Sequence, residues 1–140
     1  MRWLLAAFLL PFFVMIGAPA QAAPSYMVGT WFGHGQPEDK SAMYIDRMRP
    51  DGTWQGEYRV CIKGKSSGDQ TQTGRWKLDG EILTLGVETV SGQFWPRTDT
   101  YKMLAHDAHS QKYLSIGRKF IYTPQRVADD FKMPSCELTS

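Results

Sequence analysis

Residues 53–62 read TWQGEYRVCI, and this stretch decides the fold class. The apolar side chains that share one of its two faces are Trp54, Tyr58, Val60 and Ile62. Polar side chains occupy most of the positions between them, and this period of two is typical of a half-buried β-strand. The preceding Pro50-Asp51-Gly52 suits a tight turn, because Pro fixes φ and Gly accepts positive φ. The stretch therefore predicts a strand that is entered from a hairpin.

Short strands separated by turns are expected on both sides of this segment. The expected strands cover residues 27–33, 42–49, 71–78, 81–90, 98–105 and 112–122. Asp79-Gly80 is a two-residue hairpin turn, and residues 64–69 and 91–97 are expected to be connections. About seven or eight strands without crossover helices predict an antiparallel sandwich or barrel.

The tail has a different pattern. Thr123-Pro124 resembles an N-cap followed by proline at the first helical position. Val127 and Phe131 are four residues apart, as on one face of a helix, and Pro134 would end it. We expect a short C-terminal helix here.

The N-terminus indicates export. Arg2 precedes an apolar run from Trp3 to Gly17, and the small residues 18–23 fit an A-x-A cleavage site. We expect a signal peptide over residues 1–23 and one mature domain over residues 24–140, periplasmic or secreted. The alternative is an uncleaved membrane anchor, but prolines interrupt the run. After cleavage no stable membrane span is expected.

Charge and cysteine content limit the function classes. The chain has 16 Lys and Arg against 14 Asp and Glu, so without Arg2 the net charge is +1. No basic face is evident, which argues against a nucleic-acid partner. In an exported chain the two cysteines, Cys61 and Cys136, predict one disulfide, with two separate thiols as the alternative. Closing this loop contributes about 4 kcal/mol in the chain-entropy model.

A Gly-x-Trp pattern recurs at Gly29-Thr30-Trp31, Gly52-Thr53-Trp54 and Gly74-Arg75-Trp76. Each tryptophan would enter the core at a similar height on alternate strands. Gly29-Thr30-Trp31 after a secretory signal, the strand meander, the tail helix and the cysteine pair together resemble the lipocalin-like families. The resemblance implies an up-and-down β-barrel with a cavity for a small apolar ligand. Small bacterial barrels of this kind also include periplasmic inhibitors of secreted metalloproteases, which bind protein.

Aromatic side chains are the candidates for a ligand site. The residues expected to line it are Tyr44, Trp54, Tyr58, Trp76, Trp95 and Tyr101. In a small barrel some of these point inward, although they also suit a fully packed interior. Trp95-Pro96 is the best candidate for an exposed aromatic at a barrel mouth or interface.

Reactive groups give weaker signals. Residues 64–68 match G-x-S-x-G, but a nucleophile elbow needs a strand-to-helix turn in a large α/β sheet. His106 and His109 flank a carboxylate, yet a zinc site needs further ligands, so we assign no metal site and no cofactor.

We therefore expect a binding protein and not an enzyme. Its partner is a small hydrophobic ligand or, alternatively, a periplasmic protein such as a protease or an envelope-assembly component.

Overall fold

A computed structural model describes residues 25–36 and 39–139, so the expected signal peptide lies outside the described residues. The fold is a nine-stranded antiparallel sheet in the order β8-β7-β6-β5-β4-β3-β2-β1-β9. The elements are β1 (Gly29–Gln36), β2 (Asp39–Met48), β3 (Thr53–Ile62), β4 (Lys65–Asp79), β5 (Ile82–Val90), β6 (Gln93–His106), β7 (Gln111–Ser115), β8 (Ile121–Tyr122), β9 (Gln125–Val127) and a 3-10 helix, η1 (Cys136–Thr139). Strands β1 to β8 follow one another as a meander.

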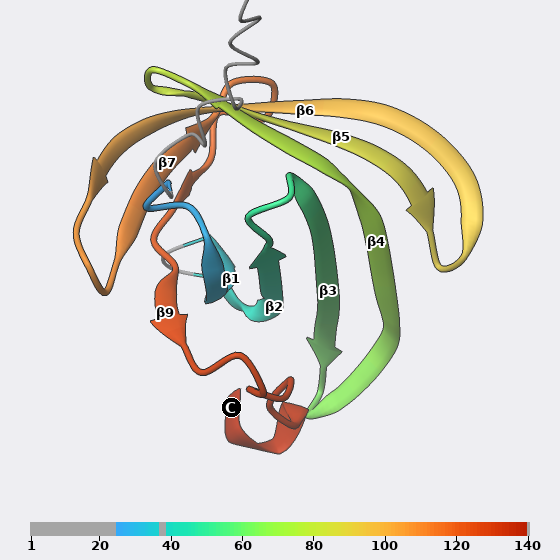
Figure 1. Ribbon diagram of the computed structural model, residues 1–140. Helices are drawn as coiled ribbons and strands as arrows, with labels where there is room; N and C mark the ends of the chain where they lie inside the picture. Colours follow the sequence, from blue (N-terminus) through green and yellow to red (C-terminus); the bar gives the residue numbers. More distant parts are fainter. Residues whose placement is uncertain (1–24, 37–38, 140) are drawn as a thin grey trace, which may run out of the picture.

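The sheet curls into a half-barrel, as Figure 1 shows. Strand β9 pairs with β1 through Thr30 and Val127, and an isolated bridge joins Gln125 to Ser110, just before β7. The Arg126 amide also donates to the carbonyl of His109 at 2.7 Å. Strand β9 therefore links the two ends of the sheet over a short stretch.

The expected strand over residues 53–62 is confirmed, with the same bounds. The expected count of seven or eight strands is too low, because the expected strand over residues 112–122 divides into β7 and β8 and the tail adds β9. Residues 64–69, expected to be a flexible loop, instead lengthen β4. Lys63 and Gly64, both with positive φ, make the turn, and β4 begins at Lys65. Arg59 pairs with Asp69 across the hairpin, Nη2 to Oδ2 at 2.6 Å, and holds this polar segment extended. Likewise, β6 begins at Gln93 after a turn at Ser91-Gly92, inside the expected connection 91–97.

The expected tail helix is wrong. Strand β9 forms there instead, and among the described residues only the four-residue η1 is helical. Pro124 is fully buried, and its carbonyl accepts a hydrogen bond from the Gln111 amide at 3.1 Å. Strand pairing on both sides of β9 satisfies backbone groups that a helix would have to satisfy internally.

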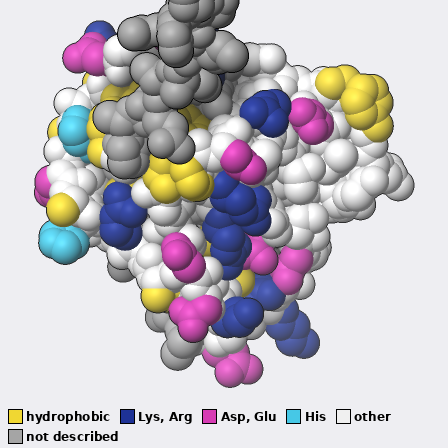
Figure 2. Space-filling model, in the orientation of Figure 1, with side chains coloured by type: hydrophobic (Ala, Val, Ile, Leu, Met, Phe, Trp, Pro, Cys, Tyr) yellow, Lys and Arg dark blue, Asp and Glu magenta, His cyan; other side chains and the backbone are white. Residues whose placement is uncertain are grey.

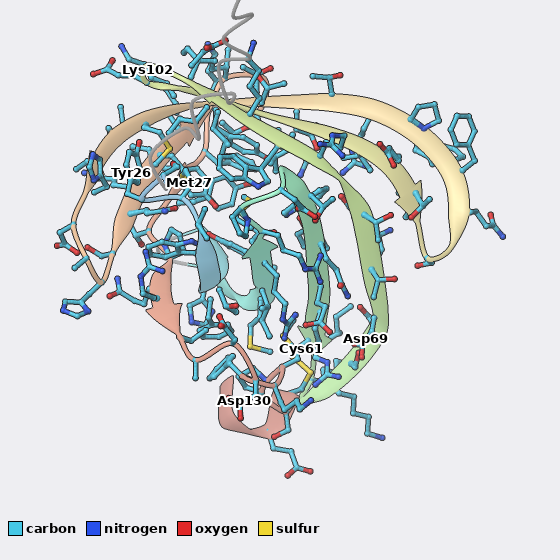
Figure 3. All side chains as sticks on the ribbon, viewed as in Figure 1. Tyr26, Met27, Cys61, Asp69, Lys102 and Asp130 are labelled. Carbon is cyan, nitrogen blue, oxygen red and sulfur yellow. A yellow bond between two sulfur atoms is a disulfide. The ribbon has the colours of Figure 1, made fainter. Side chains whose placement is uncertain are left out.

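The segment after β9 lies against the outer face of the sheet. Phe131 packs on Phe32 with ring centroids 5.1 Å apart, and Arg47 Nη2 donates to the Phe131 carbonyl at 2.9 Å. The predicted disulfide between Cys61 and Cys136 is confirmed, with Cα atoms 5.4 Å apart. Figure 3 shows this bond at the end of the molecule where the chain terminates. The tail is thus fastened to β1, β2 and β3.

The core fills one end of the concave face. Its buried side chains are Met27, Trp31, Met48, Trp54, Leu83, Leu85, Val87, Met103 and Tyr113. Trp31 and Trp54 are each 1% exposed, so these two members of the Gly-x-Trp pattern are core residues. Gly74 of the third copy is required by a close approach, because a Cβ there would overlap the carbonyl oxygen of Gly86 on β5.

Candidate ligand-binding pocket

The other end of the concave face is hollow. A pocket of about 350 Å³ opens there, lined by side chains from most of the strands and from the β7–β8 turn. The polar and aromatic lining residues are Tyr44, Asp46, Tyr58, Gln70, Gln72, Arg97, Asp99, Tyr101, Tyr113, Arg118 and Tyr122. Strand alternation places them together: for example, Arg97, Asp99 and Tyr101 are successive inward positions of β6.

Five tyrosine rings form a continuous cluster on the wall. The Tyr113 and Tyr122 rings stack with centroids 5.4 Å apart, and the Tyr101 and Tyr113 rings meet edge to face at 5.3 Å. Tyr44 contacts Tyr122 edge to face at 5.8 Å and stacks with Tyr58 at 6.4 Å. The hydroxyls of Tyr44 and Tyr113 share a hydrogen bond at 3.1 Å. This wall offers both ring faces and hydroxyl groups.

Burial raises the pKa of the innermost tyrosines. The pKa values of Tyr44, Tyr58 and Tyr113 lie well above the ordinary value of 10, first because burial disfavours the phenolate and then because other charges lie nearby. These hydroxyls therefore stay protonated at any physiological pH. They can donate hydrogen bonds to a ligand as well as accept them.

Two arginines contribute positive charge to the lining. Arg97 Nε donates to Asp99 Oδ2 at 3.1 Å, and Arg97 Nη2 donates to Gln72 Oε1 at 2.9 Å. Arg118 is an exposed residue of the β7–β8 turn, so it lies at the mouth of the pocket. The positive charge of Arg118 lies near the Tyr122 hydroxyl, where it opposes the rise in the Tyr122 pKa that burial causes.

Asp46 lies at the floor, between the pocket and the core. Its Oδ1 accepts a hydrogen bond from Trp54 Nε1 at 2.9 Å. Burial raises the pKa of Asp46 to about 7, although the Trp54 hydrogen bond opposes the rise. Asp46 also borders a second cavity of about 20 Å³, shared with Gln111 and core side chains. This volume is sufficient for one water molecule.

The candidate residues from the sequence fall into separate places. Tyr44, Tyr58 and Tyr101 come together in the pocket. Trp54 lies below it in the core, and Trp76 packs on the core with Nε1 donating to the Arg49 carbonyl at 2.9 Å.

Trp95 lies apart from the pocket, near the turn of the β5–β6 hairpin. Sequence reasoning missed several lining residues: Asp46, Arg97, Asp99, Tyr113, Arg118 and Tyr122. Alternation along β6 and β7 was the available signal for Arg97, Asp99 and Tyr113, whereas Arg118 lies in a turn that carries no such signal.

The reactive motifs have structural explanations. The His106 ring stacks on Tyr26 with centroids 3.5 Å apart, and Asp107 Oδ1 accepts hydrogen bonds from the amides of His109 and Ser110. Within residues 25–36 and 39–139 no three metal-ligating side chains are grouped. Ser66, the central serine of G-x-S-x-G, is exposed and its hydroxyl donates to Asp69 Oδ1 at 3.0 Å.

Comparison of the sequence with known protein families and with curated proteins finds no match. In the part of the chain that the structure describes, no helix is long and apolar enough to cross a membrane.

Proposed function

We propose that the protein is an exported binding protein of lipocalin-like type that holds a small molecule in the pocket of its half-barrel. The observation that carries this proposal is the 350 Å³ pocket, on which side chains from β2, β3, β4, β6, β7 and β8 converge. Small-ligand sites are typically concave, with aromatic walls and a few converging polar groups.

The lining favours a ligand with polar groups over the purely apolar ligand expected from the sequence. Tyrosine hydroxyls, Arg97, Asp46 and Gln72 all face the pocket. An alkyl chain that displaced water from these groups would leave them without hydrogen-bond partners, at a cost of about 1–3 kcal/mol for each neutral group. A ligand with a ring and polar substituents avoids this cost.

Location in the periplasm or outside the cell is part of the proposal. The disulfide between Cys61 and Cys136 is stable in an oxidising compartment, which agrees with the expected signal peptide. Mass spectrometry of the protein from the periplasm or medium should give the mass of a chain that begins near Ala23 or Pro24. That mass should be two hydrogen atoms lower than the mass of the reduced chain, because the disulfide has formed. A full-length mass would contradict export by cleavage.

A matched pair of substitutions on β3 tests the pocket. Val60 lines the pocket and is 41% exposed, whereas Ile62 is 58% exposed and does not line it. We expect Val60→Trp to fill the space and Ile62→Trp to leave it open. A library of small aromatic and polar compounds, screened by NMR, should show binding to the wild type and Ile62→Trp but not to Val60→Trp. Binding that survives Val60→Trp, or no binding at all, would reject the proposal.

A second candidate, protein binding, is supported by the β5–β6 hairpin. Phe94 is 79% exposed and Trp95 is 63% exposed, and a hydrophobic patch is visible at the projecting side of the molecule in Figure 2. Exposed aromatic side chains at a projection are typical anchors of protein interfaces. A protease or envelope component would bind this hairpin without entering the pocket.

The two candidates separate in one experiment. Trp95→Ala removes an exposed side chain, so stability should stay within about 0.5 kcal/mol of the wild type. If the hairpin binds a protein, affinity capture from periplasmic extract should recover a partner with the wild type and with Val60→Trp but lose it with Trp95→Ala. Equal recovery by the wild type and both variants would reject the hairpin as an interface.

A further inference from the structure

We infer that the pocket selects a small aromatic carboxylate, with its ring among the tyrosines and its anionic group at Arg97 and Arg118. This inference rests on the proposed function, that is, on the pocket being a ligand site. It goes further in naming the chemical class of the ligand.

The size of the pocket sets the scale of the ligand. Its volume of about 350 Å³ is near the lower end of the range for small-molecule sites. It corresponds to the volume of about a dozen water molecules. A molecule with one or two rings fits this space, whereas a long acyl chain does not.

The charges around the pocket favour an anion. Its charged lining residues are Arg97, Arg118, Asp46 and Asp99. Asp99 is paired with Arg97 through Nε. Asp46 lies buried at the floor, and because burial raises its pKa to about 7, it is largely neutral in mildly acidic solution. The pocket then carries a net positive charge, which attracts a carboxylate and repels an ammonium group.

Both arginines line the pocket, and Arg97 has N–H donors beyond those it uses within the protein. A guanidinium has five N–H donors, and the hydrogen bonds of Arg97 to Asp99 and Gln72 use two of them. Arg118 adds a second guanidinium at the mouth, close to the Tyr122 hydroxyl. Hydrogen bonds between guanidinium and carboxylate are charge-assisted and frequently bidentate, which makes them strong and selective.

The tyrosine wall favours a flat ligand. Tyr101, Tyr113 and Tyr122 contact one another edge to face or stacked at 5.3 to 6.3 Å, so their rings point in several directions around the space. A planar ring inserted among them can pack in the same edge-to-face or offset geometry. The hydroxyl pair of Tyr44 and Tyr113 can accept or donate to a substituent on that ring.

Isothermal titration calorimetry with 4-hydroxybenzoate and its neutral analogue 4-hydroxybenzamide tests this inference, at about pH 6 and low salt. We expect the carboxylate to bind at least about tenfold more tightly than the amide, since only the carboxylate can pair with the arginines. Arg118→Gln should weaken 4-hydroxybenzoate about tenfold and leave the amide unchanged. Lys119→Gln is the matched control, because it removes an adjacent positive charge that does not line the pocket.

Several outcomes would overturn the inference. They are equal affinity for the carboxylate and the amide, equal effects of Arg118→Gln and Lys119→Gln, and no measurable binding of 4-hydroxybenzoate. Circular dichroism should show that both variants keep the wild-type fold, because both side chains are exposed. If the NMR screen finds other compounds that Val60→Trp excludes while 4-hydroxybenzoate fails, the pocket remains the ligand site and only the chemical class is rejected.

Discussion

Asp46 is buried where the pocket meets the core, and its carboxyl lies near tyrosines of β2, β3, β6 and β7. Burial raises the pKa of Asp46 from 3.8 to about 7. A carboxyl in the unfolded chain titrates near its ordinary value, so between about pH 4 and pH 7 the folded protein holds one more proton than the unfolded protein. Stability from this group is therefore greatest at low pH and falls as the pH rises to 7.

Replacing Asp46 removes this pH dependence. At about 1.4 kcal/mol for each pKa unit, the carboxyl costs the wild type roughly 4 kcal/mol between pH 4 and pH 7. Asp46→Asn keeps the shape and the acceptor for Trp54 Nε1 but does not ionise. Urea unfolding followed by circular dichroism should show the free energy of unfolding falling with pH in the wild type, with a smaller fall in Asp46→Asn.

Other titrating groups do not affect the difference between the wild type and Asp46→Asn. Hydrogen bonds from Arg59 lower the pKa of Asp69 to about 2, so that carboxyl stays ionised throughout the range. Groups that do titrate between pH 4 and pH 7 are common to both proteins, so the difference between the two curves isolates Asp46. Parallel curves would show that Asp46 has an ordinary pKa.

Glycine at position 74 gives a second test at the scale of one residue. A Cβ at Gly74 would overlap the backbone carbonyl of Gly86, whereas the nearest atom to a Cβ at Gly86 is the Arg75 carbonyl oxygen at 3.8 Å. Gly74→Ala forces β4 and β5 apart and should lower the free energy of unfolding by about 1–3 kcal/mol. Gly86→Ala should change it by less than about 0.5 kcal/mol.

Denaturant titration of both glycine variants measures these changes in the free energy of unfolding. Equal stability of Gly74→Ala and Gly86→Ala would mean that the two strands can separate at this point without cost. The G-x-W copy at residues 74–76 would then have no steric origin.

At the scale of elements, sequence patterns predicted the central strands and failed at the ends. The strand over residues 53–62 was identifiable because its two faces differ in polarity throughout. The N-terminal part of β4 was not, because serine, glycine and aspartate between residues 66 and 69 are typical of loops. An ion pair between Arg59 and Asp69, ten residues apart, keeps that segment extended, and local composition does not report such a contact.

In the tail, too, local sequence does not report the long-range contacts that determine the structure. Thr123-Pro124 has a helix-start pattern, but β1 and the residues before β7 both offer backbone partners to residues 125–127. Tertiary pairing outweighs local propensity here, as it does in many short segments. The pocket was predicted only in part for a related reason, since Tyr113 and Tyr122 acquire their role from the curl of the whole sheet.

The disulfide should determine whether the tail stays attached. Changing both Cys61 and Cys136 to Ser removes a cross-link spanning 75 residues and should lower the free energy of unfolding by about 4 kcal/mol, as measured with urea. Trypsin should then cut at Lys132 earlier than in the oxidised wild type, because the tail separates more often from Phe32 and Arg47. Unchanged cleavage at Lys132 would show that packing alone holds the tail.

At the scale of the whole molecule, Arg126 of β9 contacts three other parts of the chain. Its guanidinium donates to the carbonyls of Tyr26 and Val28 before β1 and of Ala108 before β7, at 2.9 to 3.1 Å. It also lies over the Trp31 ring, 4.2 Å from the centroid. Within the described residues, β9 is the only element whose backbone pairs both with β1 and with the residue before β7. The side-chain contacts of Arg126 join the same two regions, so they reinforce the closure of the half-barrel by β9.

Arg126→Ala should weaken that closure. We expect a loss of about 1–3 kcal/mol in the free energy of unfolding, from the hydrogen bonds of a charged donor and the cation–π contact. Arg126→Lys should recover only part, because an ammonium does not reproduce the planar fork of a guanidinium. Arg75→Ala is the control, since Arg75 is exposed and its guanidinium donates to the Asp51 carbonyl at 3.1 Å.

Thermal unfolding of the three variants provides the measurement. A stability of Arg126→Ala equal to that of Arg75→Ala would show that backbone pairing of β9 suffices to close the sheet.

The hydrogen bond between Trp54 and Asp46 has an optical consequence. The indole of Trp54 is sealed in the core, yet its N–H contacts a carboxyl that borders the ligand space. Indole emission responds to the electric field at the ring, so proton loss from that carboxyl, or arrival of a guest beside it, should alter the fluorescence of Trp54. Trp54 emission is therefore expected to follow the ionisation of Asp46, and binding of the proposed ligand should change it as well.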